Sequence, residues 1–158
     1  GCIAIALAKQ FPDARVFGID VSVKALDTAI QNAKSNAVDI QFEQCDLLHQ
    51  NLQLPEETFD LIISNPPYIC QRERVQMQPN VLNYEPSLAL FVEDDDPLIF
   101  YRHIGDYASR HLSEKGILAF EINETLGEDT CSMLQSQGFN TELRKDFRGK
   151  DRMVIASR

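Results

Sequence analysis

A short run in the middle of the chain combines residue types that could hold a planar polar group. It reads Asn65-Pro66-Pro67-Tyr68 and follows an apolar segment, residues 59–63, that is typical of a buried parallel strand. Two consecutive prolines cannot continue a sheet or enter a helix, so the chain must leave the strand in a stiff turn. The amide oxygen of Asn65, the backbone carbonyl of Pro66 and the ring of Tyr68 then suit a flat group that bears an NH2.

The same run could instead form a surface turn or part of a proline-rich ligand segment. Its place directly after a hydrophobic strand favours a functional site, because ligands of open α/β sheets bind at the carboxyl ends of the strands. The candidate catalytic residues are Asn65, Pro66 and Tyr68, and Pro67 joins them in the candidate substrate-binding set.

Two aspartates also lie at or just after the ends of predicted strands. Asp20 ends a predicted strand, where a carboxylate can bind the ribose hydroxyls of a nucleotide-type cofactor, although it could simply help Ser22 to cap the next helix. Asp46 also follows a predicted strand. Its carboxylate could accept a hydrogen bond from an adenine amino group while Leu47 covers the base, or it could be an ordinary loop residue. Gly1 is interpreted as the last glycine of a loop that approaches a cofactor.

The elements that would position these residues alternate along the chain. The predicted strands are residues 15–20, 40–45, 59–64, 116–122, 141–146 and 153–157. The predicted helices are residues 1–10, a helix capped by Ser22, residues 96–112 and residues 124–138. This alternation predicts an α/β fold with a mostly parallel sheet, helices on both faces and a closing antiparallel hairpin.

Local signals add detail to these elements. One face of the second helix is predicted to be a buried stripe of Leu26, Ala29, Ile30 and Ala33. Asp96 is predicted to cap a helix that has Pro97 at its first position, and Gly138 to follow the end of a helix. Residues 69–93 read as a long polar loop, and so long an irregular stretch is usually functional.

The candidate residues follow consecutive predicted strands, so we expect them to converge on one crevice. The chain begins inside or just after a turn that should follow a further strand. We therefore expect one domain over residues 1–158, truncated at its N-terminus and lacking its first strand. The neighbours of that strand would have unpaired backbone groups. The fragment is then expected to pair its edges or swap strands in an oligomer, or to be poorly stable and inactive alone.

Composition narrows the possible functions. The net charge of −9 weighs against binding through a phosphate backbone. No stretch approaches the roughly 20 apolar residues of a membrane span, and the start lacks a signal peptide. The four cysteines and three histidines show no metal-ligand spacing, so no metal site is expected, and free thiols favour a cytoplasmic protein.

Several segments together resemble the HemK/PrmC family of N5-glutamine methyltransferases, which modify peptide chain release factors in translation termination. The segments are Asn65-Pro66-Pro67-Tyr68-Ile69, the Asp20 and Asp46 positions, Tyr84-Glu85-Pro86 with Ala89-Leu90, Phe120-Glu121-Ile122 and Asp146…Gly149-Lys150-Asp151-Arg152. The resemblance covers essentially the whole chain. It implies a Rossmann-like class I methyltransferase sheet and the cofactor S-adenosyl-L-methionine, held by Gly1, Asp20, Asp46, Leu47 and Asn65. It also implies a protein substrate, the glutamine of a Gly-Gly-Gln loop, and no membrane or direct nucleic-acid partner.

Three other hypotheses about function would explain some of these features. Adenine-N6 methyltransferases of DNA or RNA have the same Asn-Pro-Pro-Tyr motif and hold a flipped base with it. A dinucleotide-binding oxidoreductase domain would explain Asp20 but gives no reason for the motif at Asn65. A non-enzymatic module with a degenerate methyltransferase fold would not need Asp20, Asp46 and Asn65 together.

Overall fold

The computed structural model describes residues 1–49, 54, 58–77 and 86–158. The chain divides into two compact units, Gly1–Gln53 and Leu54–Arg158.

The first unit consists of two helices and a pair of strands. Its elements are α1 (Cys2–Gln10), β1 (Phe17–Asp20), α2 (Val23–Ser35) and β2 (Gln41–Gln44). The strands are parallel neighbours, with Asp20 opposite Gln44. Ser22 caps α2 as predicted, because its hydroxyl accepts the backbone N–H of Ala25 at 3.3 Å.

The stripe predicted on α2 is only partly confirmed. Leu26, Ala29 and Ala33 are buried, but Ile30 stays 37% exposed. At 3.6 residues per turn, Ile30 lies at the margin of the stripe that the other three define.

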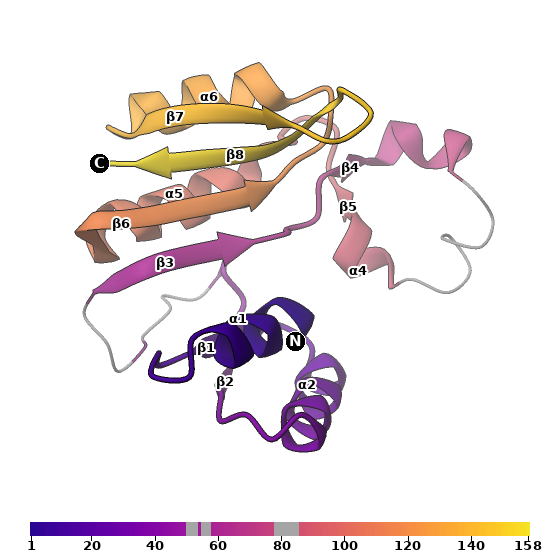
Figure 1. Ribbon diagram of the computed structural model, residues 1–158. Helices are drawn as coiled ribbons and strands as arrows, with labels where there is room; N and C mark the ends of the chain where they lie inside the picture. The colour runs from indigo at the N-terminus through magenta and orange to yellow at the C-terminus, as the bar shows by residue number, and fades with distance from the viewer. Residues whose placement is uncertain (50–53, 55–57, 78–85) are drawn as a thin grey trace. The chain divides into compact units, whose positions relative to one another are not determined.

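The second unit contains the larger sheet (Figure 1). Its elements are β3 (Phe59–Ser64), β4 (Ile69–Cys70), the 3₁₀ helix η1 (Gln71–Gln76), α4 (Ser87–Leu90), β5 (Phe91–Val92), α5 (Ile99–His111), β6 (Leu112–Glu121), α6 (Gly127–Ser136), β7 (Asn140–Lys145) and β8 (Asp151–Ser157). Four strands form one sheet in the order β3-β6-β8-β7; β3 and β6 are parallel, and β8 is antiparallel to both β6 and β7. With the parallel pairs β1–β2 and β4–β5, this confirms the predicted α/β class and closing hairpin.

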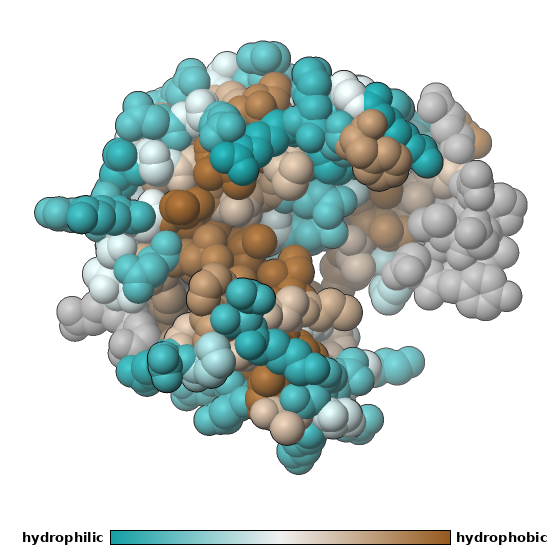
Figure 2. All heavy atoms as spheres, in the orientation of Figure 1, coloured by the Kyte–Doolittle hydropathy of each residue, from teal (hydrophilic) through white to brown (hydrophobic). Residues whose placement is uncertain are grey.

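Helices α5 and α6 pack on the same face of this sheet, because Gly105 of α5 lies against Leu134 of α6. Both lie behind the strands in Figure 1. The core beneath them includes Tyr101, whose ring meets that of Phe120 edge-on with the centroids 5.1 Å apart. The opposite face carries exposed apolar residues from three strands: Leu61, Ile63, Ile117 and Met153. Figure 2 shows brown, apolar side chains gathered over β3 and β6 on that face.

The long loop predicted after β3 is wrong in detail. Residues 69–93 are not an irregular loop where the structure describes them, since β4 and β5 pair in parallel, Ile69 with Phe91 and Cys70 with Val92. Residues 78–85 lie outside the described part, and with them Tyr84 and Glu85 of the resemblance.

Asp96 does not cap a helix, because α5 begins at Ile99, beyond the predicted start at Pro97. The carboxylate instead accepts two hydrogen bonds from the guanidinium of Arg102, at 2.8 and 2.9 Å. A charge-assisted, bidentate pair of this kind competes well with a cap.

The end of α6 is as predicted. Gly138 has a φ of +92° and directly follows the C-cap. Its N–H bonds to Gln135 and that of Phe139 to Leu134, which completes a Schellman motif. Among the described helices, none combines the length and apolar character that crossing a membrane requires.

Candidate functional site

Asp20 lies at the carboxyl end of β1, as predicted. Its side chain is exposed, and Oδ1 accepts the backbone N–H of Ser22 at 2.8 Å. Among the described residues no hydrogen bond reaches Oδ2. The carboxylate therefore supports the start of α2 and still has an oxygen that can accept a ligand hydroxyl.

Asp46 lies at the same edge of the β1–β2 pair. The backbone N–H of Cys45 bonds to the carbonyl of Asp20 at 3.1 Å, which ties the two strand ends together. The carboxylate of Asp46 accepts the N–H of Leu48 at 3.0 Å and lies 3.0 Å from Nδ1 of His49. These contacts, Leu48 first, lower the pKa of Asp46. Leu47 is half-buried in the turn that they form.

Gly1 has a packing reason to be glycine. A Cβ at this position would lie 2.7 Å from the Cβ of Ala29, so any side chain would force α1 and α2 apart. This contact accounts for the residue type without a cofactor, and the predicted role in cofactor binding stays a prediction.

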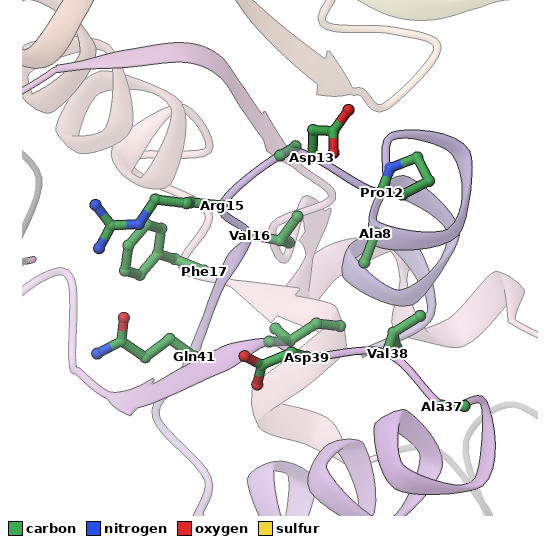
Figure 3. A pocket seen from close by; sticks show the side chains of 12 residues that line it. Ala8, Pro12, Asp13, Arg15, Val16, Phe17, Ala37, Val38, Asp39 and Gln41 are labelled. Atoms are coloured by element: carbon green, nitrogen blue, oxygen red, sulfur yellow. The ribbon is translucent and has the colours of Figure 1, made fainter.

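A hollow of about 550 Å³ in the first unit lies at the opposite strand ends (Figure 3). Its walls come from the end of α1, the segment that enters β1 and the turn before β2, and they include Arg15, Phe17, Asp39 and Gln41. Because these residues are at the amino ends of β1 and β2, the hollow is separate from the edge that bears Asp20 and Asp46.

The Asn65–Tyr68 run directly follows β3, as predicted. Ser64 is the last paired residue of the strand and lies opposite Phe120 of β6. Pro66 is buried and Pro67 and Tyr68 are half-buried, whereas Asn65 is exposed. The run therefore anchors its prolines in the protein and presents the amide of Asn65 to solvent.

Tyr68 is held by residues from the end of β6. Its hydroxyl donates to Oε1 of Glu121 at 3.2 Å, and its backbone carbonyl accepts from Nδ2 of Asn123 at 3.2 Å. Burial raises the pKa of Tyr68, and the charge of Glu121 adds to the rise, while Arg152 opposes it. The ring is therefore a neutral, fixed surface over the ordinary pH range.

Glu121, Asn123 and Glu73 were not among the predicted site residues. Glu121 is the last residue of β6, the parallel neighbour of β3, and Asn123 lies just beyond that strand end. The rule that points to Asn65 could have found these two, because it applies to every parallel strand. Glu73 has no such signal, since its role depends on the conformation of η1.

The segment from Asp146 to Arg152, part of the resemblance, comprises the turn of the β7–β8 hairpin and the first two residues of β8. Oδ1 of Asp146 accepts the backbone N–H groups of Arg148 and Lys150 at 2.8 and 3.1 Å, and Gly149 adopts a φ of +79°. The bond from Lys150 is the main cause of the lowered pKa of Asp146. These residue types therefore have a turn-forming role.

The structure thus brings the predicted residues together in two sets. Asp20 and Asp46 share the edge of β1–β2 in the first unit, and Asn65, Pro66, Pro67 and Tyr68 share the end of β3 in the second. Convergence of the two sets on one crevice stays a prediction.

Comparison with known proteins points to one family. Residues 1–149 match the family described as "Methyltransferase domain". The chain is 54% identical over 155 residues to a release factor glutamine methyltransferase of Flavobacterium psychrophilum, covering 98% of this chain and 54% of that protein. It is 40% identical over 159 residues to the protein of that name from Bacteroides thetaiotaomicron, covering 100% and 57%.

The chain thus spans about half the length of the curated relatives it matches. A methyltransferase structure from Pyrococcus furiosus has the same fold, with a TM-score of 0.68 at 17% identity over 98% of this chain and 68% of the other. The match of the family over residues 1–149 and the agreement in fold lead to one conclusion: the chain belongs to the methyltransferase domain family.

Proposed function

We propose that this chain is the catalytic domain of a release factor glutamine methyltransferase, with both units in that one domain. The reaction would move a methyl group from S-adenosyl-L-methionine to the side-chain amide nitrogen of a glutamine in a Gly-Gly-Gln loop. The observation that supports this best is the exposed amide of Asn65 on a proline-stiffened run, in a chain 54% identical to a protein of that name. Such an enzyme would work in the cytoplasm.

The cofactor would be bound by residues of the first unit. An exposed carboxylate with a free oxygen, as at Asp20, fits the two hydroxyls of a ribose, and Asp46 with Leu47 fits an adenine ring and its amino group. When bound, S-adenosyl-L-methionine supplies an electrophilic methyl group on a sulfonium.

The second unit would orient the nucleophile. A carboxamide nitrogen is a poor nucleophile because its lone pair is delocalised into the carbonyl. If Oδ1 of Asn65 and the carbonyl of Pro66 each accept one N–H of the substrate amide, its plane and nitrogen are fixed. The ring of Tyr68, held by Glu121, would pack against the amide. Orientation and electrostatic support of this kind can lower a barrier by up to about 7–11 kcal/mol.

Methyl transfer by the full-length protein from labelled S-adenosyl-L-methionine tests the proposal. We expect label in a release factor that contains Gly-Gly-Gln and none in the variant with alanine in place of that glutamine. Label in DNA or RNA and none in the release factor would establish the adenine-N6 alternative. The net charge of −9 and the identity to release factor enzymes favour the protein substrate.

A further inference from the structure

Asn123, just beyond β6, is a buried polar residue with every hydrogen-bonding group of its side chain in use. Oδ1 accepts the backbone N–H and the hydroxyl of Thr125, at 3.0 and 2.9 Å. Nδ2 donates to the carbonyl of Tyr68 at 3.2 Å and to the carboxylate of Glu73 at 3.2 and 3.4 Å. A reversed amide would place its oxygen against these acceptors, so one orientation is fixed.

The side-chain amide of Asn123 holds one end of the run that contains Asn65, because it donates to the carbonyl of Tyr68. At the other end, Ser64 is paired with Phe120 in the sheet. Only three residues, 65–67, lie between Ser64 and Tyr68. Prolines fix their own φ and restrict the residue before them to extended conformations. With both ends held and a stiff interior, the backbone at Asn65 has very few conformations.

Glu73 completes the arrangement from η1. Its carboxylate accepts the backbone N–H of Cys70 at 3.3 Å as well as the amide of Asn123. Hydrogen bonds to a carboxylate are about twice as strong as those between neutral groups, and Glu73 makes them from a half-buried position. Cys70 itself is buried and only 1% exposed.

We infer that Asn123 is a positioning residue for Asn65, and that Glu73 acts with it. The pair sets the direction of the substrate-binding amide without touching substrate or cofactor. The catalytic part of this inference rests on the proposed function; the conformational part does not.

Three variants of the full-length protein test the inference. Asn123→Ala removes the donor to Tyr68. Asn123→Asp puts a carboxylate against that of Glu73 and should be more harmful. The double variant Asn123→Asp, Glu73→Gln relieves the repulsion between the two carboxylates but still lacks the donor to the carbonyl of Tyr68, so it should be less harmful than Asn123→Asp and no better than Asn123→Ala. Leu134→Ala, in the same unit but outside these contacts, is the control for a general loss of stability.

The first readout needs neither cofactor nor substrate. Amide hydrogen exchange of Cys70 and alkylation of its thiol should each rise at least about tenfold in Asn123→Ala, since the restraint on this segment is lost. Alkylation of the buried Cys131 gives the internal reference and should change in Leu134→Ala instead. Unchanged exchange and alkylation at Cys70 would overturn the inference, whatever the enzyme methylates.

The second readout is methylation of the release factor. In Asn123→Ala, kcat should fall at least about tenfold while the KM for S-adenosyl-L-methionine stays within about twofold, because misplacing a reacting group slows chemistry without weakening cofactor binding. Wild-type kcat in the double variant, which still lacks the donor to Tyr68, would also overturn the inference. Exchange and alkylation at Cys70 can rise as expected in Asn123→Ala even if the wild-type enzyme does not methylate the release factor. In that case the proposed function fails and the conformational role of Asn123 stands.

Discussion

The two units hold their candidate residues in different ways. In the first unit, Asp20 and Asp46 accept backbone N–H groups only two residues further along the chain. In the second unit, Tyr68 bonds to Glu121 and Asn123, which are 53 and 55 residues away. Local turns therefore shape the candidate cofactor site, whereas the candidate substrate site depends on the packing of a whole sheet.

Burial follows the same division. The first unit buries Leu26, Ala29, Ala33 and Cys45, and α1 has no buried residue. The second unit fully buries large side chains such as Tyr101, Phe120 and Leu134. The unit with long-range contacts around its site is thus also the unit with the larger core.

Truncation of a core residue should reveal the largest difference between the two units. We expect Phe120→Ala to lower the free energy of unfolding by about 3–5 kcal/mol, because it empties the space beside Tyr101. Leu26→Ala in the first unit should cost less, near the lower end of a range of about 2–5 kcal/mol. Urea unfolding followed by circular dichroism measures both. Equal losses would contradict the difference in burial.

Loss of Asn65 should affect the reaction rather than the fold. In the full-length enzyme, Asn65→Ala should slow methylation at least about 10²-fold, as removal of one preorganised polar group does. Cofactor affinity should change much less, because the residues proposed to hold it belong to the first unit. Single-turnover methylation of a release factor with Gly-Gly-Gln provides the test. A wild-type rate would show that Asn65 has a structural role.

Loss of Asp20 should show the opposite pattern. Asp20→Ala should weaken S-adenosyl-L-methionine binding by about 1.5–3 kcal/mol, the usual contribution of a hydrogen bond to a charged group. Calorimetry with the full-length protein measures this. Asp27→Ala, an exposed charge in the middle of α2, is the matched control and should leave affinity unchanged. Unchanged affinity in Asp20→Ala would remove Asp20 from the site.

The ion pair between Asp96 and Arg102 should have the smallest effect. Arg102 lowers the pKa of Asp96, so the stabilisation is present above the ordinary aspartate pKa of about 3.9 and is lost as pH falls through the lower folded value. Asp96→Asn should cost less than about 1 kcal/mol at neutral pH, because the pair is partly exposed. Thermal unfolding of both proteins at several pH values checks this. A difference in stability between the two proteins that grows as the pH falls would contradict a stabilising Asp96–Arg102 pair.

What could be predicted from sequence follows the same local and long-range division. The cap at Ser22, the glycine at 138 and the bounds of β3 depend on residues close in sequence, and the structure confirms them. The prediction that Asp96 caps a helix was wrong because its partner, Arg102, lies beyond the few residues from which a cap is recognised.

The contacts behind the candidate substrate site show the limit most clearly. Asn123 bonds to Tyr68 and Glu73, 55 and 50 residues away, only after β6 and η1 have formed. No spacing in the sequence reveals a bond between residues 50 or more apart. The β4–β5 pair escaped prediction for the same reason, since two-residue strands have no periodicity to detect.

The irregular pairing at the start of β3 has a consequence for how this protein can change in length. Phe59 lies opposite Leu112 and Leu61 opposite Ile117, so β6 has extra residues there, whereas pairing from Leu61 to Ser64 is one to one. Insertions or deletions near residues 113–116 can be absorbed at this bulge without moving Asn65. A single insertion after Leu61 would reverse the faces of every later residue in the strand. We therefore expect the protein to tolerate natural changes in length and engineered tags near residues 113–116. Insertions after Leu61 should not be tolerated.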